Sequence, residues 1–326
     1  MASPLAKPCS ALCRLALGAV GLVARQRLTV LIFHRVLPEQ DPLFPSELHA
    51  ARFEGLMYMV AGAFNVLPLD QALNRLAQGT LPRRSLAISF DDGYADNHDI
   101  AFPILKRFGL SATVFVSTGF LGGGRMWNDT VIESIRRTRQ TTLDMAEFGL
   151  GQVAVETAAQ RRAAISALLP LVKYSAPEAR RAMLERIQAL AGRPELPSDF
   201  MMTPEQVVNM HKGGMGIGAH TVNHPILATL PDAEARAELA NSRSQLQAMI
   251  DAPVTLFAYP NGRPGKDYDR RHVEMARELG FAAALSTIPA VAQGGADLFQ
   301  VPRYTPWDVG DLRWMARLSA THMGGR

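Results

Sequence analysis

The chain has 326 residues, of which 48% are apolar and 20% are charged, and its net charge is +4 with a pI near 9.3. This length and apolar content are typical of a large soluble enzyme with one big core. The mild basicity could favour an acidic polymer or a membrane surface, but no Lys/Arg run interleaved with aromatic residues predicts a nucleic-acid partner. Cys9 and Cys13 are the only cysteines, which excludes a disulfide framework and leaves no second pair for a zinc site.

Residues 1–27 are expected to form an apolar N-terminal helix. The stretch 11–24 is apolar apart from Arg14, and it is shorter than the roughly 20 residues that a membrane span needs. A signal peptide would need a longer apolar region and a cleavage site of small residues. We therefore expect a cytoplasmic protein whose retained helix packs on the main domain or touches the inner membrane face.

Predicted strands and helices alternate along the main domain, residues 28–310. Helices are expected over 98–108, 232–250 and 270–279, and this alternation indicates an α/β protein built from parallel βα units. Residues 128–192 break the pattern and predict a helical insertion over the rim, and residues 311–326 are expected to be a C-terminal tail. The strand candidates are 28–34, 63–67, 85–90, 111–116, 215–220, 253–259, 281–286 and 298–303.

Two of these strands end in residues that can bind a metal. Asp91 and Asp92 follow strand 85–90, and His220 ends strand 215–220 with His224 four residues later. Two His at this spacing can face one point on a helical turn, and three ligands leave an open position for water and substrate. Asp92, His220 and His224 would then be the ligands and Asp91 the base. Alternatively, the Asp pair caps a helix and the His pair lies on an exposed face, but barrels place their chemistry at strand ends.

Three motifs together resemble the polysaccharide deacetylases with a NodB-type domain, carbohydrate esterase family 4. They are Ser89 to Gly93, His220 to His224, and the Phe-Ala-Tyr-Pro-Asn-Gly turn at 257–262. The resemblance covers roughly residues 28–305 and implies an irregular (β/α)7 barrel. It further implies that Asp91 is the general base, and that Asp92, His220 and His224 hold a divalent metal, zinc or another first-row ion. Tyr259 would contact substrate and help to form the oxyanion hole through its backbone N–H.

The chain departs from the family pattern at two positions. Many members carry an Arg that begins the third motif and a late His that protonates the leaving amine, whereas this chain has Leu256 to Ala258 and Leu285 to Pro289 there. The strand ending in His34 resembles the opening of the branch that acts on poly-N-acetylglucosamine-type exopolysaccharides, which implies His34 as the general acid. Residues 299–304 resemble a Leu-Pro-Arg segment of that branch, which implies Arg303 as the charge partner of Asp91. Otherwise, His34 is a strand-end residue bonded to backbone and Arg303 is a surface ion pair.

Trp127 follows three glycines and could stack on a sugar ring or anchor the insertion to the barrel. The sequence favours a metal-dependent deacetylase that hydrolyses the N-acetyl group of amino sugars in a polysaccharide or its precursor, using metal-activated water. Its expected partner is an N-acetylated glycan. One alternative is a glycan O-acetyl esterase or small-molecule amidase on the same metal site, and another is a carbohydrate-binding protein that has lost catalysis.

Overall fold

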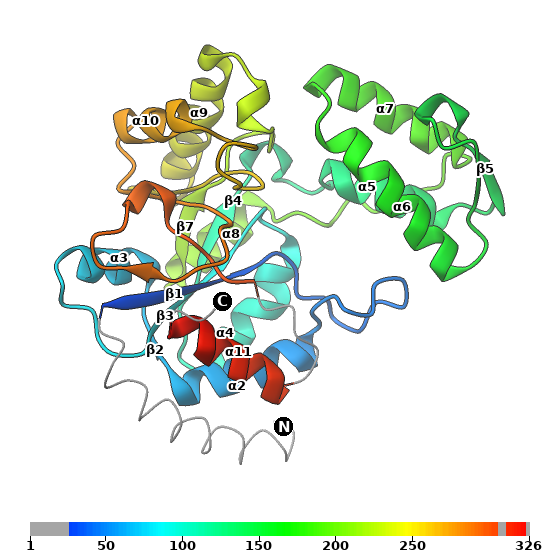
Figure 1. The fold of residues 1–326 in the computed structure, drawn as a ribbon. Helices are drawn as coiled ribbons and strands as arrows, with labels where there is room; N and C mark the ends of the chain where they lie inside the picture. Colours follow the sequence, from blue (N-terminus) through cyan, green and yellow to red (C-terminus); the bar gives the residue numbers. More distant parts are fainter. Residues whose placement is uncertain (1–25, 306–310, 324–326) are drawn as a thin grey trace.

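The computed structural model describes residues 26–305 and 311–323, and a curled, mainly parallel sheet lies at its centre (Figure 1). The strands run in the order β10, β1, β3, β4, β7, β8 and β9, and β2 also pairs with β3. All of these pairings are parallel except that of β10 with β1. The bounds are β1 (Arg27–Phe33), β2 (Asn65–Val66), β3 (Ser85–Phe90), β4 (Thr113–Val116), β7 (Gly216–Ala219), β8 (Leu256–Ala258), β9 (Ala283–Leu285) and β10 (Ala292–Gln293).

Residues 301–304 close the sheet between β9 and β1. Val301 forms a parallel bridge with Leu285, and Tyr304 forms one with Leu31. The Val301 N–H donates to the Ala284 carbonyl at 3.0 Å, and the Tyr304 N–H donates to the Val30 carbonyl at 2.8 Å. This segment takes the seventh position of the expected irregular (β/α)7 barrel. The strand expected over 298–303 is wrong in its first half, because Leu298–Gln300 forms a 3-10 turn that Asp297 caps.

The two faces of the sheet pack on different helices. Leu28 on β1 and Leu256 on β8 share one buried cluster with helix α3 (Leu69–Ala77), so this face is the inside of the barrel and α3 closes one end. The alternate residues Leu31 and Phe33 join a larger outer core. The helices around it are α2 (Ala50–Ala63), α4 (Phe102–Arg107), α8 (Pro204–Lys212), α9 (Asp232–Ile250) and α10 (Arg270–Glu278).

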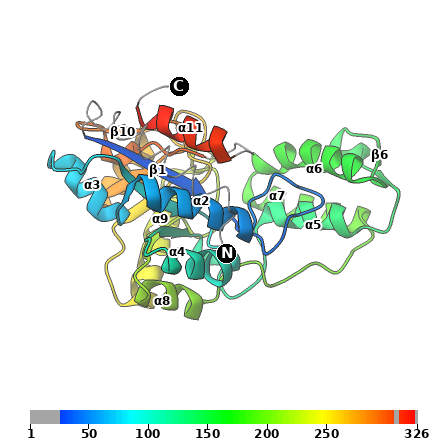
Figure 2. The same cartoon turned by 90° about the horizontal axis from the view of Figure 1, so that it is seen from below.

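The insertion stands beside the barrel with a core of its own (Figures 1 and 2). Its helices are α5 (Trp127–Arg137), α6 (Ala158–Lys173) and α7 (Pro177–Leu190). These helices agree with the expected helical insertion, but the sequence did not predict the antiparallel pair that β5 (Thr142–Asp144) and β6 (Gln152–Ala154) form between α5 and α6. Strands of three residues are too short to produce a clear alternating pattern in the sequence.

The C-terminal segment is part of the barrel core and is not a tail. Helix α11 (Asp311–His322) buries Trp314, Met315 and Leu318 completely. The ring of His322 lies 2.9 Å from the Thr29 hydroxyl on β1. The N-terminal helix expected over residues 1–27 lies almost entirely outside the described residues. Across 26–305 and 311–323, no helix has the length and apolar character needed to cross a membrane.

Candidate active site

The carboxyl end of β3 places two buried carboxylates in one loop. Ala87, Ser89 and Asp91 alternate with outward-facing residues, so the Asp91 side chain points into the barrel. Asp92 has a φ of +75° and Gly93 a φ of +90°, and this sharp turn directs the Asp92 carboxylate toward the neighbouring strand end. A Cβ at Gly93 would lie 3.2 Å from the Val116 side chain, so both backbone angle and space favour glycine.

Asp92, His220 and His224 form a compact ligand cluster. Their candidate ligand atoms all lie within 4.8 Å of one another, and the three residues are buried. The Asp92 Oδ1 atom is 3.5 Å from Nε2 of His220 and 3.4 Å from Nε2 of His224, and it has no hydrogen-bond partner among the described residues. A buried acceptor without a donor is costly, and a divalent cation between these three atoms would satisfy it. The donor set therefore fits a metal ion.

The two His side chains converge by a different route from the predicted helical turn. Residues 220–224 form a loop in which Thr221 and His224 have φ values of +67° and +50°. The His220 ring is fixed by a 2.7 Å contact between its Nδ1 and the Ala258 carbonyl, which directs Nε2 toward Asp92. Positive φ at residues with a side chain is uncommon, and its recurrence at Asp92, Thr221 and His224 is typical of functional sites.

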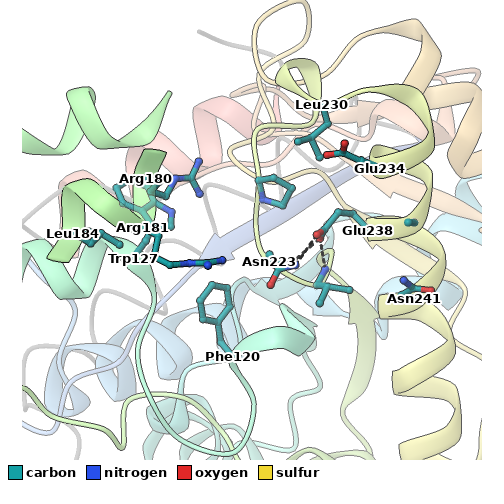
Figure 3. A pocket seen from close by; sticks show the side chains of 13 residues that line it. Phe120, Trp127, Arg180, Arg181, Leu184, Asn223, Leu230, Glu234, Glu238 and Asn241 are labelled. Atoms are coloured by element: carbon teal, nitrogen blue, oxygen red, sulfur yellow. Dashed lines mark hydrogen bonds between the residues drawn. The ribbon is translucent and has the colours of Figure 1, made fainter. Parts of the chain in front are cut away.

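Glu238 on α9 holds this loop and was missed by the sequence analysis. Its Oε2 accepts hydrogen bonds of 2.8 Å from the backbone N–H groups of Val222 and Asn223, and its Oε1 accepts one of 2.7 Å from the Asn223 amide (Figure 3). No sequence signal pointed to Glu238, because an acidic residue on an amphipathic helix is usually solvated and its partners lie about 15 residues away.

Asp91 forms a bidentate ion pair with Arg303. The guanidinium Nη1 lies 2.6 Å from Oδ1, and Nη2 lies 2.8 Å from Oδ2. The Arg303 Nε donates to the Ser286 carbonyl at 2.9 Å, and the Arg303 residue is only 1% exposed. The alternative of a surface ion pair is therefore wrong, because Arg303 lies in the segment that closes the barrel and points inward beside β3.

The charges of the site are mutually compensated. Burial alone would raise the pKa of Asp91, but Arg303 and His220 outweigh burial and hold that pKa below its usual range. Burial would likewise raise the pKa of Asp92, and the two His residues lower it. Burial lowers the pKa of His224 to about 3, so this imidazole is neutral near neutral pH and one of its ring nitrogens can offer a lone pair to a metal.

His34 lines the catalytic cavity with both aspartates. It follows Leu28, Val30 and Ile32 in the inward alternation of β1, and its side chain is exposed. Asn97 Nδ2 donates to the His34 carbonyl at 2.8 Å, which fixes the backbone and leaves the imidazole free of that contact. The structure thus brings His34, Asp91, Asp92, His220 and His224 to a single cavity.

The structure contradicts both assignments made for Tyr259. Its N–H donates to the Leu285 carbonyl at 3.1 Å within the sheet and is not available to a substrate oxygen. Its ring follows the outward alternation of β8, stacks on Tyr268 with centroids 3.8 Å apart and is completely buried in the outer core. Asn261, two residues later, lines the cavity with a φ of +59°, and its N–H has no acceptor in the described part of the chain.

Trp127 lies at the first turn of α5 and lines the catalytic cavity. The Arg180 guanidinium carbon is 5.1 Å from the centroid of its ring system, so Trp127 contacts both the cavity and helix α7 of the insertion. Both roles expected from the sequence, sugar contact and anchor, are compatible with this position.

A buried carboxylate held by arginine, beside a second carboxylate and two histidines at the carboxyl ends of barrel strands, defines the site of a hydrolase. The sequence profile of polysaccharide deacetylases matches residues 78–284, which is more than half of the chain. The chain therefore belongs to the polysaccharide deacetylase family, whose members are hydrolases of carbon–nitrogen bonds other than peptide bonds.

Similar proteins are consistent with this assignment. The Bacillus subtilis (strain 168) protein YxkH, which carries a polysaccharide deacetylase name, is 19% identical over 278 residues, covering 85% of this chain and 70% of YxkH. A poly-beta-1,6-N-acetyl-D-glucosamine N-deacetylase of Staphylococcus epidermidis is 32% identical over 73 residues, covering 22% of this chain and 25% of that protein.

Two solved structures share the fold. The Streptococcus pyogenes deacetylase PplD, in complex with acetate, superposes with a TM-score of 0.61 at 17% identity, covering 89% of this chain and 97% of PplD. IcaB from Ammonifex degensii superposes with a TM-score of 0.57 at 19% identity, covering 91% of this chain and 97% of IcaB. At these identities the likeness concerns the fold.

Proposed function

We propose that this protein is a divalent-metal-dependent deacetylase that hydrolyses the N-acetyl group of amino sugars in a polysaccharide or its precursor. The observation that carries this proposal is the position of Asp92 Oδ1, a buried acceptor that has no donor among the described residues and lies near the Nε2 atoms of two histidines. Asp91, which Arg303 keeps ionised, lies beside it. One carboxylate and two imidazoles suit zinc, and other first-row divalent ions accept the same ligands.

Each residue of the cavity has a separate role in the proposed reaction. A divalent ion held by Asp92, His220 and His224 would polarise the acetamide carbonyl and make a nearby water more acidic. Asp91 accepts a proton from the attacking water, and Arg303 keeps both Asp91 oxygens oriented for this task. The backbone N–H of Asn261 donates to the carbonyl oxygen as negative charge develops on it.

His34 supplies the proton that the leaving nitrogen needs. The water oxygen bonds to the acetyl carbon, the carbon–nitrogen bond breaks, and the products are acetate and a free amine. An exposed imidazole at the cavity wall can exchange protons with solvent and return to its acid form after each turnover.

The test compares amide and ester substrates in the presence of a divalent metal. The purified full chain is incubated with N-acetylglucosamine oligomers and, separately, with O-acetylated glycans, and released acetate and new amine are measured independently. Amine formation on the oligomers, abolished in Asp91→Asn, is the expected result. Acetate released from the esters alone would instead assign the site to an O-acetyl esterase, and retained glycan binding without any release would indicate a binding protein.

A further inference from the structure

Three basic side chains lie at the mouth of the catalytic cavity. Lys173 at the end of α6, and Arg263 and Lys266 in the loop after β8, line this cavity, whose volume is about 1390 Å³. None of the three forms an ion pair within residues 26–305 and 311–323. The carboxylates that line the same cavity are Asp91 and Asp92, and these are committed to Arg303 and to the ligand cluster.

An exposed aromatic side chain lies close to two of these cations. The ammonium of Lys266 is 4.8 Å and that of Lys173 is 5.7 Å from the ring centroid of Tyr174, which is 39% exposed. Tyr174 and Lys173 belong to the insertion, whereas Lys266 belongs to the barrel. The two parts of the protein therefore both contribute positive charge beside one exposed ring, a combination that suits a charged sugar.

A second groove, of about 520 Å³, lies between α7 and α9, and Trp127 lines both it and the catalytic cavity (Figure 3). Arg180 in its wall is 7% exposed, and it has no carboxylate partner among the described residues. Its Nη2 donates to the Lys173 carbonyl at 3.0 Å, but its buried Nε has no acceptor in the part of the chain that the structure describes. A buried cation without a counter-ion is destabilising, and an anionic ligand group in this groove would compensate it.

The opposite wall of the groove is acidic, but one of its two carboxylates already accepts hydrogen bonds within the protein. Glu238 accepts the three hydrogen bonds that hold the loop between the two metal-ligating histidines. Glu234 is exposed near the start of α9. The wall formed by α7 adds Arg181 to Arg180, so positive charge is concentrated on the side of the groove that adjoins Trp127 and the catalytic cavity (Figure 3).

Building on the proposed deacetylase function, we infer that the substrate is an anionic glycan, whose carboxylate or phosphate groups flank the N-acetylated sugar and bind the basic residues on both sides of Trp127. The mouth residues Lys173, Arg263 and Lys266 contact one flank, and Arg180 contacts the other. The charges attract the polymer and orient it, while the neutral acetamido sugar lies over the ligand cluster.

The experiment compares acidic and neutral substrates that contain the same reacting sugar. A hexasaccharide of alternating N-acetylglucosamine and glucuronate is compared with an N-acetylglucosamine hexamer, and N-acetylglucosamine 1-phosphate is compared with N-acetylglucosamine. At low ionic strength, kcat/KM for the acidic hexamer should exceed that for the neutral hexamer by about 10-fold, and the excess should vanish near 0.5 M salt. A higher kcat/KM for the uronate hexamer would indicate that the substrate is a repeating acidic glycan. A higher kcat/KM for the sugar phosphate alone would indicate that the substrate carries its charge as a phosphate.

Charge-removing variants connect this preference to named residues. The double variant Arg263→Gln with Lys266→Gln should lower the acidic-to-neutral ratio of kcat/KM by about 3-fold or more, because Lys173 and Arg180 remain, whereas Lys266→Arg should keep most of the preference. Arg83→Gln is the matched control, because Arg83 is an exposed cation at the opposite end of β3 and lines neither cavity. It should leave both rates unchanged.

Binding measurements separate failure of this inference from failure of the proposed function. Calorimetric titration of metal-loaded Asp91→Asn with the two hexamers reports charge preference without turnover. Inactivity of the parent protein on all N-acetylated probes, with preferential binding of the acidic hexamer, would reject the deacetylase proposal and support the anionic ligand. Equal kcat/KM values and equal affinities for acidic and neutral probes would overturn the inference.

Discussion

Replacing Arg303 with methionine should destabilise the protein and abolish most activity while leaving metal binding intact. The guanidinium makes two contacts of 2.6 and 2.8 Å with Asp91, and both side chains are at most 3% exposed. Each buried, charge-assisted hydrogen bond contributes about 1.5–3 kcal/mol, and breaking a buried pair by removing one partner costs about 3–5 kcal/mol. We therefore expect urea unfolding of Arg303→Met to report a loss of about 3–5 kcal/mol.

A double-mutant cycle identifies the source of this loss. Asp91→Asn removes the charge that Arg303→Met leaves uncompensated, so the double variant should be more stable than the sum of the two single losses predicts, by about 1–3 kcal/mol. Metal content should remain near one ion per chain in all three variants, because Arg303 contacts Ser89, Asp91 and Ser286 and none of the proposed ligands. Additive losses, or an Arg303→Met protein with parental stability, would show that the ion pair does not have the energetic role that its geometry indicates.

Three further predictions concern the ligands, the acid and the C-terminal helix. Alanine in place of Asp92, His220 or His224 should lower metal content and activity together. A variant that still binds one metal ion per chain would show that the replaced residue is not a ligand. His34→Ala should slow amide hydrolysis by about 10²- to 10⁴-fold, with a much smaller loss on an activated ester, whereas equal losses would refute the acid role. Burial, aided by the positive charge of Arg27, lowers the pKa of His322 to about 4, below its ordinary value near 6.5. The unfolded chain therefore binds this proton before the folded protein does, so stability should fall as pH decreases through this window, by about 2 kcal/mol between roughly pH 7 and pH 5. Urea unfolding of His322→Gln should lack this part of the pH dependence, and parallel curves for the two proteins would contradict the assignment.

Several features of the protein could be predicted from local sequence. The apolar runs ending at Asp91 and His220 are the strands β3 and β7, and helices α9 and α10 begin and end within one residue of their predicted bounds. Such elements are readable because hydrophobic periodicity and turn residues are local properties. The same reasoning placed the Asp92, His220 and His224 side chains together, since the carboxyl ends of parallel strands meet at one edge of a sheet.

The roles that depend on a hydrogen-bond partner were decided by the tertiary structure. Whether the Tyr259 N–H is free depends on whether β9 supplies the Leu285 carbonyl, and sequence alone does not show this pairing. The inward position of Arg303 depends on residues 301–304, which close the barrel through isolated bridges and not through a full strand. Sequence patterns do not predict such bridges. The loop conformation at His220 and His224 likewise depends on Glu238 from a distant helix.

The sequence by itself determined the residue types of the site and the order in which strands present them, because these depend on local pattern and chain direction. The tertiary structure decided which polar atoms have partners. Within residues 26–305 and 311–323, the Tyr259 N–H donates to a carbonyl and Asp91 is paired, whereas the Asn261 N–H and the Nε of Arg180 have no acceptor. The physical reason is that hydrogen bonds and ion pairs join residues far apart in the chain, and their geometry exists only after the barrel has closed and the insertion has packed beside it.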